Sequence, residues 1–297
     1  MTARERGFLL LTGHLGNPER RVLTPAQLRN LAKLVSAGTV PREDREMTAE
    51  DLEHLGCERE MARRVVSLLE EEDILDYYLG KARKAGCVPI TRVSEVYPLA
   101  VRKRLGLDSP GCFWAKGDLS ILDMPKISLV GSRVLQEANR DFAAEVGYQA
   151  AKQGIALVSG NARGADQTAQ EACLAAGGRV ISIVADELYN KENRDGMLWL
   201  SEDDFDAPFT TVRALSRNRV IHCLGSGVLV AQCTLEKGGT WDGSVKNLRF
   251  GWSRICCFDD GSEAMSRLES MGAWLIGPEY LTDLDGLFIQ PYQLLEE

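Results

Sequence analysis

The segment 159–166, Ser-Gly-Asn-Ala-Arg-Gly-Ala-Asp, combines glycines with an arginine and an aspartate. It follows the apolar run 155–158, which predicts a buried strand, and precedes the helix-forming run 167–176. The first N–H groups of a helix lack partners and lie at the positive end of its dipole, so such a turn can bind an anion. Arg163 can add a bidentate phosphate contact, and Asp166 can cap the helix, orient Arg163 or contact a sugar hydroxyl. A tight turn capped by Asp166 is the alternative interpretation.

A second unit of the same kind lies upstream. The run 127–130 predicts a strand, Gly131-Ser132-Arg133 follows it, and the segment 139–153 predicts a helix. Two successive strand–turn–helix units that each place glycine, serine and arginine at the strand exit predict a shared anion site at the carboxyl edge of one sheet. Gly131 has no glycine two or five residues later, so the unit lacks the usual dinucleotide fingerprint.

Arg217-Asn218-Arg219 forms a third candidate, with Arg213 four residues before Arg217. Residues four apart share one face of a helix, so these arginines predict a phosphate-binding cluster. The alternative is a surface ion-pair network, because acidic residues precede the cluster. These acidic residues are Glu202, Asp203, Asp204 and Asp206.

The fourth candidate is Lys237-Gly238-Gly239-Thr240, which follows the predicted strand 227–231 and precedes the predicted helix 243–250. Exposed backbone N–H groups, a hydroxyl and an ammonium are the parts of a phosphate cradle. An ordinary glycine turn explains the same residues, and the order of a Walker A loop is absent. If the cradle interpretation is right, three strand ends of the sheet converge on one anion site.

Composition limits the classes of function. The chain has 297 residues, a formal net charge of −8 and 44% hydrophobic residues, and no apolar run approaches the length of a membrane span. A local basic patch on this acidic background predicts modest, salt-sensitive binding to nucleic acid. The eight cysteines show no CxxC spacing, which predicts reduced core thiols rather than a zinc site or disulfides. We therefore expect a cytoplasmic protein without a membrane segment, a metal or a cofactor.

Alternating strand and helix patterns predict an α/β fold, a doubly wound and mostly parallel sheet covered on both faces. The expected strands are 127–130, 155–158, 179–184, 227–231, 254–258 and 273–276. The expected helices are 139–153, 166–176, 212–222, 243–250 and 262–271.

The first part of the chain has a different pattern. Thr24-Pro25 and Thr48 are helix start signals, and a third helix is expected over 58–71. We predict a helical domain over 1–78, of the SAM or helix-hairpin-helix type or simply a structural cap, and a Rossmann-like domain over 79–297. Within the latter, the segment 86–122 predicts short strands and turns, and the tail after Gly277, with Pro278 and Pro291, predicts irregular structure.

Taken together, these motifs resemble the DprA/Smf family of DNA-processing proteins. The resemblance rests on Tyr97-Pro98, on 114–120 (Trp-Ala-Lys-Gly-Asp-Leu-Ser), 130–133, 159–166, 177–181 and 217–219, and on Gly238-Gly239. It implies an extended Rossmann-like fold, a non-enzymatic protein that binds single-stranded DNA, homodimerisation, and loading of a RecA-type recombinase during transformation or recombination. Gln170 stands where the family usually has histidine, and the winged-helix domain of many members is not recognisable in the sequence.

The resemblance also implies roles for individual residues. Phosphate contacts fall to Arg133, Arg163, Arg217, Arg219 and Lys237, while Ser132, Ser159, Gly160 and Gly164 shape the pocket. The complete predicted DNA- or phosphate-binding set adds Gly131, Ala162, Asp166, Asn218, Gly238, Gly239 and Thr240.

Two other functions fit the same motifs. One is a nucleotide-ligand sensor related to the SMF/LOG-like Rossmann proteins, since phosphate groups of a mononucleotide and of DNA make the same contacts. The other is a nucleotide phosphoribohydrolase, for which Asp242 is the candidate acid and Glu236 lies on the wrong side of the glycines. His14, His54 and His222 lie outside the motifs, so no nucleophilic triad is predicted.

Overall fold

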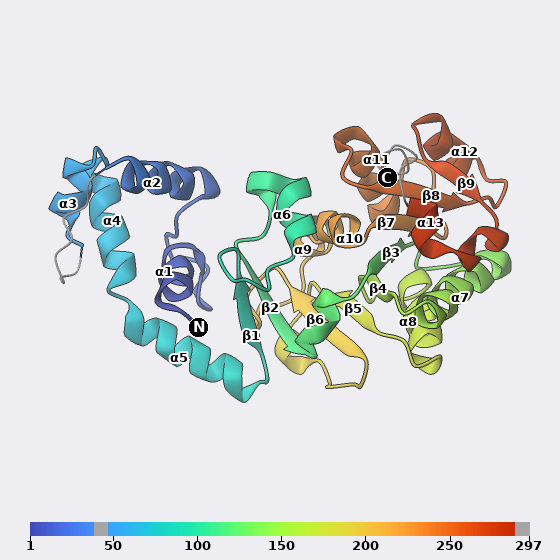
Figure 1. Cartoon of the computed structure of the whole chain (residues 1–297), viewed down its shortest axis with the longest axis horizontal. Helices are drawn as coiled ribbons and strands as arrows, with labels where there is room; N and C mark the ends of the chain where they lie inside the picture. The colour runs from blue at the N-terminus through green and yellow to red at the C-terminus, as the bar shows by residue number, and fades with distance from the viewer. Residues whose placement is uncertain (39–46, 289–297) are drawn as a thin grey trace, which may run out of the picture.

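The computed structural model describes residues 1–38 and 47–288, and a nine-stranded sheet forms its largest layer (Figure 1). In spatial order the strands are β1 (Val88–Thr91), β2 (Cys112–Gly117), β6 (Met197–Ser201), β5 (Val180–Ile183), β4 (Ala156–Ser159), β3 (Lys126–Val130), β7 (Gly227–Val230), β8 (Arg254–Phe258) and β9 (Trp274–Ile276). The strands from β6 to β9 in this order are parallel, whereas β2 pairs antiparallel with both β1 and β6. The prediction of an α/β fold with a mostly parallel sheet is confirmed.

The order of the strands reverses between β3 and β7. From β3 the chain steps outward to β4, β5 and β6, and from β7 it steps in the other direction to β8 and β9. Doubly wound sheets bind ligands beyond the carboxyl ends of the strands at such a reversal, because the loops there diverge to opposite faces and leave a crevice. The loops after β3 and β7 therefore lie where a binding site is expected.

Helices cover both faces of the sheet, as a parallel sheet requires. One face carries α7 (Glu137–Lys152), α8 (Ala165–Ala175), η4 (Pro278–Thr282) and α13 (Leu284–Phe288). The other carries α6 (Leu99–Leu105), α10 (Asn218–Leu224), α11 (Gly238–Phe250) and α12 (Glu263–Ser270). Side chains alternate along each strand, so Leu129 packs in the first layer and Val130 in the second. This alternation holds the exit of β3 between two packed layers.

The N-terminal part of the chain is helical, as predicted. Its helices are α1 (Ala3–Thr12), α2 (Pro25–Ala37), α3 (Ala49–His54), α4 (Arg59–Leu69) and α5 (Glu72–Lys84). Thr24 and Thr48 cap α2 and α3, and each side chain accepts the backbone N–H three residues later. The three helices α2, α3 and α4 share an apolar cluster that includes Leu31, Leu52 and Val65.

Helices α1 and α5 connect this cluster to the sheet. Tyr78 of α5 packs edge-on against Trp114 of β2, with ring centroids 5.5 Å apart, and its hydroxyl donates to Asp206 at 2.6 Å. In Figure 1 the N-terminal helices form the blue and cyan lobe on the side of β1. The division between residues 78 and 79 remains a prediction; Tyr78 itself lies in the middle of α5.

Two predicted helices differ from the observed ones. The predicted helix 212–222 is two helices, α9 (Thr211–Ser216) and α10, with Arg217 at the junction. The predicted helix 243–250 begins earlier, at Gly238, because hydrogen bonds from other elements hold a glycine-rich first turn whose own helix propensity is weak.

Other segments also differ from the sequence-based expectation. Strand β6 was not predicted, and α6 lies in the segment expected to hold only strands and turns. The tail after Gly277 is helical in η4 and α13 rather than irregular, while Pro291 lies outside the described residues. The remaining short helices are η1 (Gly106–Asp108), η2 (Leu119–Asp123) and η3 (Leu188–Asn190).

All eight cysteines are free thiols, and burial raises the pKa of Cys173 to about 11. Across residues 1–38 and 47–288, no helix combines the length and the apolar character needed to cross a bilayer.

Candidate nucleic-acid interface

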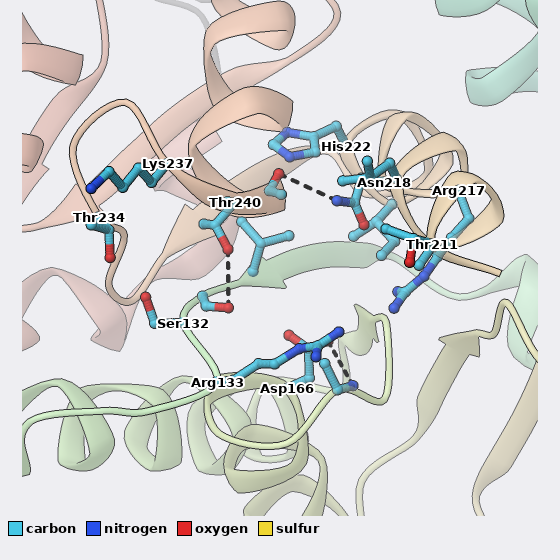
Figure 2. A pocket seen from close by; sticks show the side chains of 18 of the residues that line it. Ser132, Arg133, Asp166, Thr211, Arg217, Asn218, His222, Thr234, Lys237 and Thr240 are labelled. Atoms are coloured by element: carbon cyan, nitrogen blue, oxygen red, sulfur yellow. Dashed lines mark hydrogen bonds between the residues drawn. The ribbon is translucent and has the colours of Figure 1, made fainter. Parts of the chain in front are cut away.

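A pocket of about 500 Å³ lies at the reversal of strand order. Its walls come from the loops after β3 and β7, the first turn of α8, and helices α9, α10 and α11 (Figure 2). A smaller hollow of about 190 Å³ adjoins it and is lined mainly by the loops after β4 and β5. Arg133, Ala162 and Arg217 line both, so the two spaces share a wall.

Hydrogen bonds tie the loop after β3 to the loop after β7. Ser132 donates its backbone N–H to the carbonyl oxygen of Gln232 at 2.9 Å, and Thr240 donates its hydroxyl to the carbonyl oxygen of Gly131 at 3.0 Å. A side chain at Gly131 would overlap Ala165 of α8, so glycine allows close contact between the loop and this helix. The predicted Gly131, Ser132 and Arg133 therefore all line the pocket.

The buried carboxylate of Asp166 organises the loop after β4. Its Oδ2 accepts the backbone N–H groups of Gly160 at 3.0 Å and of Ala162 at 3.1 Å. Gly164 has φ +85°, and a side chain there would overlap the carbonyl oxygen of Ser132. Asp166 therefore holds this loop in shape rather than capping α8, whose N-cap is Gly164. Burial raises its pKa, against the opposing effect of the nearby Arg217.

Arg163 lies at the exposed rim of the smaller hollow and does not line the larger pocket. Gly160 also lines the smaller hollow. Ser159, in contrast, is fully buried and lines neither space. Its hydroxyl accepts a hydrogen bond of 2.5 Å from Gln170 of α8, which also reaches Ser182 of β5. Ser159 thus stabilises the end of β4 through a buried hydrogen bond. Gln170 links α8 to both β4 and β5.

Arg217 is a buried cation of the site. It is only 8% exposed, yet its Nε and Nη1 have no hydrogen-bond partner. A side chain at Gly160 would overlap its guanidinium, so glycine at 160 makes the space that the arginine occupies. Burial lowers the pKa of Arg217, although Asp166 opposes this effect. Arginine stays protonated in proteins, so the pocket contains a buried and incompletely compensated positive charge.

Arg219 is directed away from the pocket, contrary to the prediction. Its Nη1 forms an ion pair of 2.6 Å with Glu202, and its guanidinium also donates to the carbonyl oxygens of Ser216 and Asp108. Arg213 pairs with Asp203 at 3.4 Å. Arg213 and Arg217 keep their helical spacing, since the backbone N–H of Arg217 donates to the carbonyl oxygen of Arg213 at 2.9 Å, but the ion pair with Asp203 holds the side chain of Arg213. The ion-pair network is the correct interpretation for Arg213 and Arg219.

The first turn of α11 forms the opposite wall. Gly238, Gly239 and Thr240 line the pocket, and Asn218 donates its side-chain amide to the carbonyl oxygen of Gly239 at 3.3 Å. Figure 2 shows Lys237 and Thr234 at one end of the pocket and Arg217 at the other, with Arg133 and Asp166 along the opposite side. The pocket therefore has a cationic group near each end and helix N–H groups between them.

Comparison with known proteins agrees with this architecture. A family model described as DNA recombination-mediator protein A matches residues 89–244, which is more than half of the chain. The chain belongs to this family. The match includes every predicted site residue, from Gly131 to Thr240.

Individual relatives of this family member are distant. DNA processing protein DprA of Streptococcus pneumoniae is 31% identical over 141 residues, covering 44% of this chain and 50% of the relative. Protein Smf of Escherichia coli is 26% identical over 216 residues, covering 68% of this chain and 54% of the relative. The chain spans about half the length of these curated relatives.

Two solved structures share the fold. The X-ray structure of DNA processing protein A from Streptococcus pneumoniae gives a TM-score of 0.71 at 23% identity, covering 98% of this chain and all of that chain. A structure concerned with the single-stranded DNA binding mode of DNA processing protein A from Helicobacter pylori gives 0.57 at 20% identity, covering 68% of this chain and 97% of that chain. These likenesses confirm the extended Rossmann-like fold.

The sequence did not predict several residues that line the pocket, among them His222 and Phe209. His222 was placed outside the motifs, yet its buried ring lines the pocket. Its position one helical turn after Asn218 was the available signal. Phe209 lines both the pocket and the smaller hollow and is 54% exposed. It stands alone in a loop, and the sequence carried no periodic signal for it.

The residues considered for catalysis lie elsewhere. Asp242 pairs with Lys246 at 2.8 Å on the exposed side of α11, and neither Asp242 nor Glu236 lines the pocket. In the described part of the chain, no group of three or more histidine, cysteine, aspartate or glutamate side chains is arranged to hold a metal ion.

Proposed function

We propose that this pocket binds single-stranded DNA and that the protein acts in recombination without catalysing a reaction. The observation that carries the proposal is Arg217, a buried guanidinium whose Nε and Nη1 have no partner in the protein. Burying a charge without a partner is costly, and a phosphate oxygen would compensate it. The names of the relatives, DNA processing protein and DNA recombination-mediator protein, point to DNA as the source of that phosphate.

The shape of the site favours a strand over a mononucleotide. The pocket and the smaller hollow meet at Arg217 and Phe209, so a chain can continue from one space into the next. Lys237 and Arg217 lie at opposite ends of the pocket, which suits a nucleoside with a phosphate on each side (Figure 2). Exposed aromatic rings such as Phe209 stack on bases without regard to sequence. A mononucleotide sensor would need only one of these spaces.

Family membership extends the proposal to partners. We include a RecA-type recombinase as the recipient of the bound strand and a homodimer as the working assembly, in the context of transformation or another recombination process. The phosphoribohydrolase alternative has little support, because Asp242 lies outside the pocket and is paired with Lys246.

Binding of a fluorescent single-stranded oligonucleotide at low and moderate salt tests the proposal. We expect Arg217→Ala to weaken binding at least tenfold, since it removes the charged group that the site leaves uncompensated. Arg267→Ala removes the same charge from the exposed surface of α12 and serves as the matched control. Equal affinities for the two variants, or no binding at low salt, would contradict the proposal. In that case mononucleotides become the ligands to test.

A further inference from the structure

The loop over residues 202–210 joins β6 to α9 and contacts both the pocket and the N-terminal helices. Near the end of this loop, Phe209 is 54% exposed and lines the pocket and the smaller hollow. Thr211, the first residue of α9, lies in the pocket on the same side as Arg217 (Figure 2). The DNA contacts proposed above therefore depend on where this loop is held.

The middle of the loop is anchored on α5 and β2. The ring of Phe205 is 2% exposed and packs against Tyr78 and Trp114, with ring centroids 4.9 Å and 5.1 Å away. The next residue, Asp206, accepts a hydrogen bond of 2.6 Å from the hydroxyl of Tyr78 and forms an ion pair of 3.2 Å with Lys81. Two consecutive loop residues thus contact the same helix, one through its ring and one through its carboxylate.

Contacts on either side of this anchor limit the movement of the loop. Asp204 accepts the backbone N–H of Gly16, in the segment after α1, at 2.8 Å. Pro208 has a fixed φ, and its carbonyl oxygen accepts a hydrogen bond from Arg213 of α9. The backbone that leads to Phe209 is therefore held by the N-terminal helices on one side and by α9 on the other.

We propose that the N-terminal helices position Phe209 for stacking on a base of the bound strand, through the hydrogen bond between Tyr78 and Asp206. This inference rests on the proposed binding of DNA. Phe209 follows Asp206 by three residues, while neither Tyr78 nor Asp206 lines the pocket or the hollow. An aromatic ring on a freely moving loop loses conformational freedom when it stacks, so a loop that is held in advance binds the strand more tightly. Tyr78 and Asp206 are thus positioning residues, and only Phe209 contacts the base.

Affinities for a thymidine homopolymer and for an abasic strand of equal length test this inference. Tyr78→Phe removes one hydroxyl and keeps the packed ring, so we expect affinity for the thymidine strand to fall about threefold, the cost of ordering one side chain. Binding of the abasic strand should not change, because it has no base to stack. Phe209→Ala should also lower only the affinity for the thymidine strand, by about tenfold. Tyr148→Phe removes the same group from an exposed position on α7 and is the matched control.

Two further comparisons separate positioning from a general effect on folding. Asp206→Asn keeps an oxygen that can accept the bond from Tyr78 and should retain the affinity for the thymidine strand, whereas Asp206→Ala should lower it as Tyr78→Phe does. In the Phe209→Ala background, Tyr78→Phe should have no further effect, because the ring that it positions is absent.

Three results would overturn the inference while leaving DNA binding intact. They are equal losses for both strands, an unchanged affinity of Tyr78→Phe for the thymidine strand, and losses that add when Tyr78→Phe and Phe209→Ala are combined. If the unaltered protein binds neither strand, the proposed function itself fails.

Discussion

The guanidinium of Arg217 occupies the space that a side chain at residue 160 would fill. Gly160 lies at the exit of β4 and Arg217 at the junction of α9 and α10, so the two residues link separate parts of the Rossmann-like core. The arginine is buried in this space while its Nε and Nη1 remain without partners. The glycine therefore positions a charge for a ligand, in addition to forming a turn.

This relationship gives the first prediction. Gly160→Ala should displace the guanidinium of Arg217 and lower affinity for single-stranded DNA about as much as Arg217→Ala does, at least tenfold. The reason is steric, since the new Cβ would overlap the arginine. Titration of a labelled oligonucleotide measures the effect, and Gly80→Ala should leave the affinity unchanged. If Gly160→Ala binds DNA like the unaltered protein, Arg217 does not act from its observed position.

The ion pair of Arg219 gives a prediction about stability rather than binding. Glu202 is almost completely buried, and burial raises its pKa, while Arg219 opposes that effect. Arg219→Ala would leave a buried carboxylate without its partner, which should lower the free energy of unfolding by about 3 kcal/mol. Arg213→Ala should cost much less, since its pair with Asp203 is more exposed. Chemical denaturation of the two variants measures both losses. Similar losses would show that the pair of Arg219 with Glu202 stabilises the protein no more than the pair of Arg213 with Asp203 does.

The contrast between Arg217 and Arg219 shows what the sequence could predict. The sequence placed an anion site at the strand exits, because glycines and arginines followed several apolar runs, and the structure brings most of these residues to one pocket. It could not predict the directions of the arginine side chains. That depends on acidic partners such as Glu202, which directly follows the unpredicted strand β6.

Ser159 illustrates the same limit for a smaller residue. The family resemblance implied that Ser159 shapes the pocket, but strand alternation turns its hydroxyl to Gln170 in the core. His222 shows the opposite error, since it was set aside as lying outside the motifs and the structure places it at the pocket wall. Both outcomes depend on how helices pack against the sheet and against one another, which local patterns do not contain.

The buried imidazole of His222 predicts a pH dependence of stability. Its pKa is lowered to about 4 in the folded protein from an ordinary value of 6.5, so the unfolded chain binds the proton more readily between these values. The neutral His222 ring therefore contributes fully to the stability of the folded protein above pH 6.5, and this contribution is lost as the pH falls toward 4. At about 1.4 kcal/mol per pKa unit, the loss amounts to about 3 kcal/mol.

Two partly buried carboxylates elsewhere in the chain act in the opposite direction. Burial raises the pKa values of Asp203 and Asp204, so their contributions to stability improve as the pH falls through those raised values toward the ordinary one. The measurement is therefore the difference in unfolding free energy between the unaltered protein and His222→Phe across this pH range. We expect this difference to become smaller on acidification. A constant difference would mean that His222 titrates alike in the folded and unfolded chain.

Lys237 supplies the last prediction, which separates its role from that of Arg217. The lysine is exposed at the end of the pocket opposite Arg217, ahead of the first turn of α11. If it neutralises one phosphate of a bound strand, Lys237→Ala should reduce the slope of log affinity against log salt by ~0.7, the value for one contact with a single strand. Affinity should fall equally for strands of different base composition, because phosphate contacts carry no sequence information. Lys246→Ala, on the exposed side of the same helix, should leave the slope unchanged. An unchanged slope for Lys237→Ala would place the bound phosphates at the Arg217 end alone and remove the argument for a nucleoside held between two phosphates.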